Sequence, residues 1–304
     1  MIKFFLSVPL LIAVIAIGMG SGIDALVKAI APDAGLHHLL AWRFLFGGLI
    51  ALCVFRAQNR PMPSAEAIRF HAMRGIVQLG GAFTFFYALM HLRLAEATTI
   101  GFTAALMVPF VAWALLGEKI TKIALLATVI GFAGASLAVT GNPPEAIPDG
   151  NRMLGIASCF LAAFLYALVL VLLRMRATKE DATTIAMFTN VMPAIAMLPV
   201  TIGLFGMPDW SDIPYFVMFG IFGYVVWYLM TLAYARAPAQ RLAPLEYTAL
   251  IWSGLFGSIF FSEYPGWQTW AGAVIIIAAC LIVAFEGRFS TRRETKLPVS
   301  DLPE

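Results

Sequence analysis

Three charged residues lie well inside apolar stretches of this sequence, where a charge has little solvent: Asp24, Arg43 and Glu246. A charge at the centre of a membrane helix costs about 2.5–3.5 kcal/mol, so such residues are normally paired or functional. Asp24 and Arg43 lie at similar depths, which predicts an ion pair; Asp24 can also meet Lys28 one helical turn away. We expect this pair either to bind a substrate or proton, or to clamp two helices while Lys28 reaches the surface. The clamp is the preferred interpretation.

Glu246 follows Pro244, which removes one helix hydrogen bond and can open the local backbone. No basic residue in a neighbouring stretch lies at an obvious matching depth. We therefore interpret this carboxyl group as a site for a proton or a cationic substrate, with a packed, hydrogen-bonded carboxyl group as the alternative. Two further glutamates, Glu118 and Glu263, each end an apolar stretch and are expected to play equivalent structural parts, Glu118 by organising a tight turn.

Other polar and aromatic side chains could line a substrate cavity, with rings stacking on the cargo and hydroxyls fixing its polar parts. The candidates are Gln78, Thr99, Thr103, Tyr166, Trp227, Tyr228 and Trp252. At helical spacing Thr99 and Thr103 share one face, and Tyr224, Trp227 and Tyr228 share another. The alternative roles are Trp and Tyr as anchors at the membrane interface, and Thr bonded to its own helix.

The sequence has no constellation for catalysis inside a membrane. There is no HExxH motif, no pair of carboxylates at metal-binding spacing and no Ser/His or Cys/His couple. The histidines fall at loops or at the ends of stretches, where we expect them to be solvated: His37, His38, His71 and His91. We expect no enzymatic activity, no metal and no cofactor.

Membrane helices are the elements that must position these residues. Charged residues make up 12% of the 304 residues, against roughly 25% in soluble domains, and apolar residues make up 61%. A helical span needs about 20 apolar residues. Breaks in the pattern delimit ten spans, at 5–29, 37–55, 70–90, 94–116, 121–140, 152–173, 182–204, 213–235, 239–261 and 267–285. A cleavable signal peptide is the alternative for the first stretch, which is long for one.

Basic residues are divided unevenly between the two sides of these spans. Sixteen of the twenty Lys and Arg residues lie at the termini and in alternate connections, whereas the opposite connections hold only Arg93 and Arg152. Because basic residues favour cytoplasmic loops, both termini are predicted to be cytoplasmic. The net charge of +3 is then a topology signal. The expected partners are the lipid bilayer, a small-molecule substrate and protons, and no nucleic acid.

The chain contains an internal duplication. A shift of 145 positions brings Thr103 onto Thr248 and Glu118 onto Glu263. We divide the chain into a first five-helix repeat at 1–140, a second at 150–286 and a cytoplasmic tail at 287–304. Because five is odd, the second repeat enters the bilayer upside down. The predicted fold is an all-α integral membrane protein of ten helices in two inverted repeats, a recurrent design of secondary transporters.

Several short motifs keep their order across both halves: Lys28, Arg43-Phe44, Leu94-Ala95-Glu96-Ala97-Thr98, Leu116-Gly117-Glu118, Ala243-Pro244-Leu245-Glu246-Tyr247 and Ser262-Glu263. In these the chain, over about 5–286, resembles the drug/metabolite transporter superfamily, specifically its ten-span EamA-like members. The first span departs from the family pattern: Gly18-Met19-Gly20-Ser21-Gly22 stands where an aromatic-Gly pair is often found.

That resemblance implies a transporter of the bacterial inner membrane, monomeric or weakly dimeric, that moves a small amphipathic metabolite by alternating access. Export of amino acids or related metabolites, with proton exchange as the driving force, is the expected activity. The alternative is uptake of a cofactor or nucleoside-like compound such as S-adenosylmethionine or riboflavin. A passive channel also stays open, since a cavity with few charges could conduct.

Overall fold

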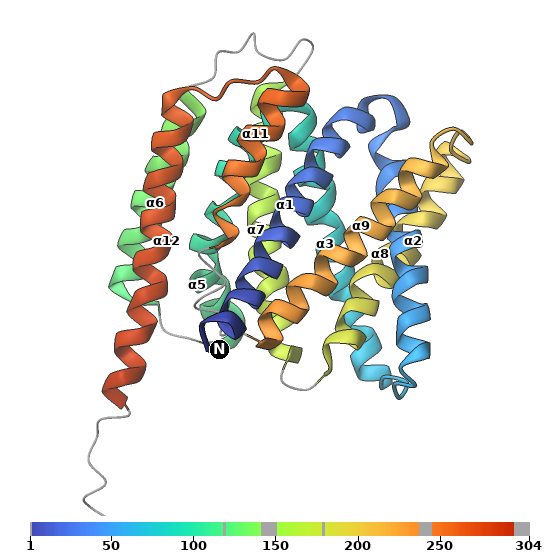
Figure 1. Ribbon diagram of the computed structural model, residues 1–304, viewed down its shortest axis with the longest axis horizontal. Helices are drawn as coiled ribbons and strands as arrows, with labels where there is room; N and C mark the ends of the chain where they lie inside the picture. Colours follow the sequence, from blue (N-terminus) through green and yellow to red (C-terminus); the bar gives the residue numbers. More distant parts are fainter. Residues whose placement is uncertain (1, 118–119, 141–150, 178–179, 237–244, 295–304) are drawn as a thin grey trace, which may run out of the picture.

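The computed structural model describes residues 2–117, 120–140, 151–177, 180–236 and 245–294, which form helices joined by short segments (Figure 1). The helices are α1 (Ile2–Ala34), α2 (Leu36–Ala57), α3 (Ala65–His91), α4 (Leu94–Gly101), α5 (Thr103–Leu116), α6 (Lys122–Thr140), α7 (Arg152–Ala177), α8 (Ala182–Phe205), α9 (Ile213–Arg236), α11 (Ala249–Phe261) and α12 (Trp267–Glu294). These ranges contain no strand, so the all-α fold class is confirmed for them.

Long apolar helices make the chain a multi-pass membrane protein. Within the described ranges, six segments are long and apolar enough to cross a bilayer: Leu10–Ala34, Leu36–Ala57, Leu94–Leu116, Arg152–Leu173, Thr183–Phe205 and Ile213–Met230. Three apolar runs are shorter: Leu125–Ala138, Ala249–Phe261 and Trp267–Ile282. The predicted third span lies in α3, which is not among the six and carries the polar His71, Arg74 and Gln78. The count of ten spans stays a prediction.

Sequence signals account for the ends of several helices. Ser64 caps α3 by accepting a hydrogen bond from the Ala67 amide at 3.2 Å, and Asp181 caps α8 by accepting from the Thr183 amide at 3.0 Å. At the other end of a helix, Gly117 closes α5 in the left-handed conformation, at φ 69°. Glycine adopts that conformation without steric cost, so it commonly ends helices.

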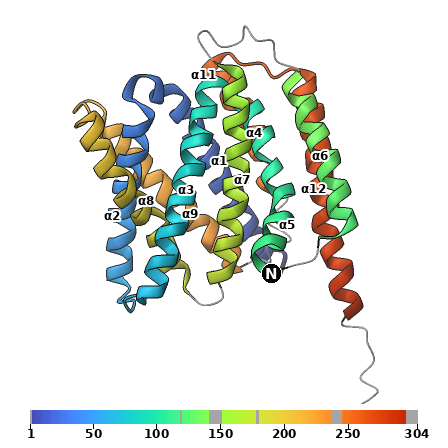
Figure 2. The same ribbon diagram turned by 180° about the vertical axis from the view of Figure 1, so that it is seen from behind.

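The two halves of the chain pack through repeat-related helices. Helix α2 lies against α8 and α6 against α12, so each of these helices meets its own counterpart. The contact of α1 with α9 is matched by that of α7 with α3. In both views α6 and α12 stand side by side at one edge of the bundle (Figures 1 and 2). A two-fold relation between two repeats produces this pattern; their opposite orientation in the membrane stays a prediction.

Local structure also recurs at the 145-residue offset. Thr103 and Thr248 each donate a hydrogen bond to the carbonyl three residues earlier, both at 2.6 Å. Gly117 and Ser262 both end helices in the left-handed conformation, at φ 69° and 54°. Residues other than glycine seldom adopt this conformation. Its recurrence at Ser262 is therefore strong evidence that the halves share one fold.

The expected span 94–116 consists of two helices. Helix α4 ends at Gly101 and α5 begins at Thr103, with Phe102 between them. The Thr103 hydroxyl donates a hydrogen bond to the Ile100 carbonyl oxygen. This bond competes with the backbone hydrogen bonds of a regular helix at this point. Pro109 lies inside α5 and does not interrupt it.

Helices α6 and α12 approach closely at glycines, which makes their contact sensitive to one methyl group. A Cβ on Gly272 would overlap the Gly134 carbonyl oxygen and would lie 2.8 Å from Ala138 Cβ. Gly272→Ala should therefore push the helices apart and lower the free energy of unfolding by roughly 1–3 kcal/mol. Gly203→Ala is the control, because a Cβ there meets nothing within 4 Å. Thermal unfolding in detergent measures both, and equal midpoints would contradict the prediction.

Candidate functional site

Asp24 of α1 and Arg43 of α2 carry opposite charges inside the bundle. Both residues are partly buried, and each charge acts on the other. The predicted ion pair does not form, because no N–O distance between them is within 4.0 Å. Among the described residues, no side chain or backbone group hydrogen-bonds to either charged group. The expected direct clamp between the first two helices is therefore absent.

Aromatic rings, rather than a carboxylate, contact the guanidinium of Arg43. Its guanidinium lies over the Phe44 ring at 4.9 Å from the centroid, and over the Phe86 ring of α3 at 5.4 Å. On α9, Gly223 leaves room for it, since a Cβ there would lie 3.3 Å from Arg43 Nε. Aromatic faces attract a guanidinium. These contacts keep Arg43 between α2, α3 and α9 without consuming its N–H donors.

Trp252 of α11 lies across α1. A Cβ added to Gly18 would be 3.0 Å from the indole Cε2, so the missing side chain lets the ring rest on the helix. Trp252 also stacks on Phe256 at 6.0 Å between centroids, and Phe256 would touch a Cβ on Gly22 at 3.7 Å. The glycine-rich segment by which the first span departs from the family pattern is thus the surface on which α11 aromatic rings pack.

Glu246 lies outside the regular helix α11, which begins at Ala249. Residues 239–244 of the predicted ninth span, among them Pro244, lie outside the described ranges. At the 145-residue offset, Glu246 and Tyr247 correspond to the break between α4 and α5 at Phe102. The Phe102 and Tyr247 rings meet edge-on, with centroids 5.2 Å apart. The interruptions of the two repeats therefore touch each other.

Two tyrosine side chains lie within range of the Glu246 charge, and one of them also contacts a thiol. The Glu246 charge acts on Tyr166 of α7 and on Tyr247. Tyr247 in turn interacts with Cys280 of α12, whose Sγ lies 3.9 Å from the Phe102 carbonyl oxygen. Among the described residues, no group of three or more His, Cys, Asp or Glu could hold a metal ion.

The hydroxyl and amide candidates bind backbone groups. Thr99 donates to the Ala95 carbonyl at 2.8 Å, and Thr103 donates within its own turn. Gln78 donates to the Thr189 carbonyl at 3.2 Å. Thr99 therefore bonds to its own helix, whereas the Thr103 hydroxyl bonds to the last turn of the preceding helix.

The aromatic candidates differ in exposure. Tyr166 and Tyr228 expose 40% and 44% of their surface, whereas Trp227 is partly buried. Tyr228 stacks on Tyr224, one turn earlier on α9, at 6.1 Å between centroids. The shared face expected for the α9 rings is therefore present for these two tyrosines.

Lys28 and Glu263 form a buried ion pair between the ends of α1 and α11. Their charged atoms are 2.5 Å apart, and the side chains are only 9% and 11% exposed. Lys28 also donates to the Leu92 carbonyl, and Glu263 accepts from the Leu94 amide at 2.8 Å. These contacts correct the expectation that Lys28 meets Asp24 or reaches the surface. Its partner comes from the other half of the chain, which a scan for neighbours on one helix cannot find.

A second ion pair at this end of the bundle has no counterpart in the sequence-based candidates. Glu96 is 1% exposed and pairs with Arg152 at 2.7 Å. Nearby, Arg93 donates to the Tyr264 carbonyl at 3.1 Å. A signal for these contacts was present in the sequence: the connections on this side hold only two basic residues, Arg93 and Arg152, and each of them has a specific partner. Glu118, the repeat counterpart of Glu263, lies outside the described residues.

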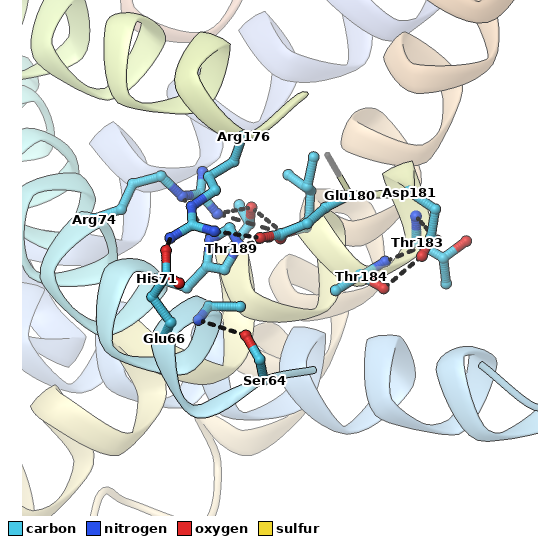
Figure 3. A network of polar contacts seen from close by, with 12 residues as sticks. Ser64, Glu66, His71, Arg74, Arg176, Glu180, Asp181, Thr183, Thr184 and Thr189 are labelled. Atoms are coloured by element: carbon cyan, nitrogen blue, oxygen red, sulfur yellow. Dashed lines mark hydrogen bonds and ion pairs between the residues drawn. The ribbon is translucent and has the colours of Figure 1, made fainter. Parts of the chain in front are cut away.

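The opposite end of α3 carries a buried polar network (Figure 3). Arg74, 2% exposed, donates from Nε to His71 Nδ1 at 3.2 Å and from Nη2 to the Thr189 hydroxyl at 2.9 Å. Because Nδ1 accepts, the His71 proton is assigned to Nε2, which donates to Glu180 at 2.5 Å. The imidazole also stacks on Phe188, 4.5 Å away.

This network corrects the expectation that His71 is solvated, and it also includes Arg74, one of the sixteen basic residues counted with the alternate connections. Both are buried, and Arg176 of α7 joins them by pairing with Glu66 at 2.7 Å and with Glu180 at 3.6 Å. Figure 3 shows these side chains converging from α3, α7 and the segment before α8.

Known proteins similar to this chain are membrane transporters. The model of the EamA-like transporter family matches residues 6–140 and again 153–285. S-adenosylmethionine uptake transporters of Rickettsia felis and Rickettsia prowazekii are 23% and 24% identical over 89% and 88% of the chain, and over 90% and 89% of their own lengths. An uncharacterized transporter of Helicobacter pylori is 25% identical over 86% of the chain and 89% of its own length. A crystal structure that is 20% identical, with a TM-score of 0.62, covers 92% of this chain and 98% of its own and shares the fold.

The buried Lys28–Glu263 pair predicts a coupled effect on stability. Lys28→Met and Glu263→Gln should each lower the free energy of unfolding by about 2–4 kcal/mol, because each leaves a buried polar partner unsatisfied. The double variant should lose less stability than the sum of the two single losses, and the difference should be about 1–3 kcal/mol. Unfolding midpoints of the four proteins in detergent measure this coupling. Additive losses would show that the pair does not act as a unit.

Proposed function

Since the chain belongs to the EamA-like transporter family, we propose that it is a secondary transporter that moves a small amphipathic metabolite across a bacterial inner membrane by alternating access. One observation carries this proposal: the interruptions at Phe102 and Tyr247 occupy equivalent positions in the two repeats and touch each other. Irregular backbone at membrane depth is tolerated only where protein or a water-filled cavity replaces lipid. Two such points in contact give the halves a shared centre about which each side can open in turn.

The proposed cargo is S-adenosylmethionine or a closely related metabolite, moved inwards. Relatives that carry the name of S-adenosylmethionine uptake transporters match along nearly the whole chain. Export of amino acids, the activity first expected from the family resemblance, has less support than this alternative. The chemistry of the interior fits the cargo, because Asp24 and Glu246 can attract its positive charges while rings such as Trp227 stack on its base.

Reconstitution tests the cargo and the direction. Purified full-length protein in proteoliposomes, or cells that express it, should take up radiolabelled S-adenosylmethionine in a saturable manner above the protein-free or empty-vector control. Unlabelled S-adenosylmethionine should compete. No uptake by protein shown to be in the membrane, together with faster efflux of preloaded amino acids, would instead support export.

Glu246→Gln tests proton coupling. The substitution preserves shape but removes the group that a transported proton would neutralise at membrane depth, beside Tyr166 and Tyr247. We expect uptake to lose its dependence on an imposed pH gradient, while the unfolding midpoint stays near that of the wild type. Glu66→Gln is the control, because the Glu66 side chain is 81% exposed. A pH dependence unchanged by Glu246→Gln would remove the proton role from this residue.

A further inference from the structure

We propose that Asp24 and Arg43 bind the zwitterionic α-amino-acid headgroup of the cargo, with the guanidinium on the α-carboxylate and the Asp24 carboxylate on the α-ammonium group. The inference rests on the proposed function and deepens it, because it names the part of the cargo that this one pair of residues recognises. Neither residue is assigned to a ligand by the names of the related proteins.

The first step is the separation of two opposite charges. In a medium of low dielectric constant, opposite charges attract strongly and tend to collapse into an ion pair. Asp24 and Arg43 attract each other electrostatically, yet their charged atoms stay more than 4.0 Å apart. The Phe44 and Phe86 rings and the open space above Gly223 hold Arg43 in its own position. The protein thus keeps the two charges apart.

The second step is that the protein leaves both groups available. Within the described ranges neither receives or gives a hydrogen bond, although a guanidinium has five donors and a carboxylate two acceptor oxygens. Their polar atoms are not among the buried atoms that lack a partner, so each keeps accessible surface. Lys28, one turn from Asp24, is committed to Glu263 and the Leu92 carbonyl.

The third step is the kind of ligand that satisfies both groups at once. A simple anion would be drawn to Arg43 and repelled by Asp24, and a simple cation the reverse. A ligand that carries an ammonium and a carboxylate on one carbon offers each protein charge its complement and adds no net charge to the interior. A carboxylate on a guanidinium can form two parallel hydrogen bonds, the strongest arrangement for this pair. An α-amino-acid headgroup therefore fits, whereas a nucleoside alone does not.

The position of Arg43 contributes to the selectivity. The guanidinium is fixed from α2, α3 and α9, whereas Asp24 is on α1. A bound headgroup would connect α1 to the other three helices through Asp24 and Arg43, which do not pair directly with each other. In this proposal the cargo supplies the hydrogen-bond partners that the described residues do not give to these two charges.

Binding measurements with fragments of the cargo test the inference on purified full-length protein. The probes are S-adenosylmethionine, its decarboxylated form, and 5′-methylthioadenosine, which lacks the whole headgroup. Arg43→Gln should raise the Kd for S-adenosylmethionine by roughly 10- to 100-fold, the loss expected for hydrogen bonds to a charged group. It should leave the Kd for the decarboxylated form unchanged or lower. Asp24→Asn should weaken both of these ligands, which keep the ammonium group, and leave 5′-methylthioadenosine unchanged.

Matched controls separate a local effect from a general loss of charge. Arg56→Gln and Asp33→Asn remove the same charges from exposed positions on the same two helices and should leave every Kd unchanged. If Arg43→Gln does not fold, Gly223→Ala provides a second route, because it keeps both charges but crowds Arg43 Nε at 3.3 Å. It should weaken S-adenosylmethionine more than the decarboxylated form. Unfolding midpoints check that each variant is folded.

The outcomes distinguish this inference from the function on which it rests. Equal weakening of all three ligands in Arg43→Gln and Asp24→Asn, or no weakening, would overturn the headgroup site even if the wild type transports S-adenosylmethionine. If the wild type binds no nucleoside ligand but binds methionine, with losses in both variants and not in the controls, the headgroup site stands and the proposed cargo fails.

Discussion

Hydrocarbon cannot solvate a charge, and the structure follows from how the chain meets that constraint. The buried charges near both ends of the bundle find opposite charges or hydrogen-bond partners. Each of these contacts links the first half of the chain to the second: the Lys28–Glu263 and Glu96–Arg152 ion pairs and the hydrogen bond from His71 to Glu180. The contacts that make charged helices tolerable in lipid are therefore also the contacts that join the two repeats.

This distribution has a consequence for movement between the halves. Lys28–Glu263 and Glu96–Arg152 lie at one end of α3, and the His71–Arg74–Glu180 network lies at the other. In the proposed transport cycle, opening one end of the bundle would break the polar contacts at that end, which is costly while the groups stay buried and less costly once water enters. The contacts at the two ends would then balance each other, and cargo or ions bound between them would supply the free energy that shifts this balance.

The sequence predicts the helices and the duplication well, because both are written in local patterns. Apolar runs define the helices, and the offset that pairs Thr103 with Thr248 recurs as equal hydrogen bonds. Partners from distant segments are what local patterns cannot supply. Lys28 lies one helical turn from Asp24 but pairs with Glu263. His71 lies at the start of a predicted span, where solvent is expected, but its ring is buried against Phe188.

The break between α4 and α5 shows the same limit from another side. Proline is the strongest signal for interrupting a helix, yet Pro109 lies within α5 while the interruption falls at Phe102. A helix hydrogen bond lost at a proline can be absorbed by neighbouring helices. The interruption at Phe102 instead meets Tyr247, the matching point of the other repeat, ring edge against ring face. The two interruptions therefore lie together, at the place where the alternating movement of the proposed transporter would be centred.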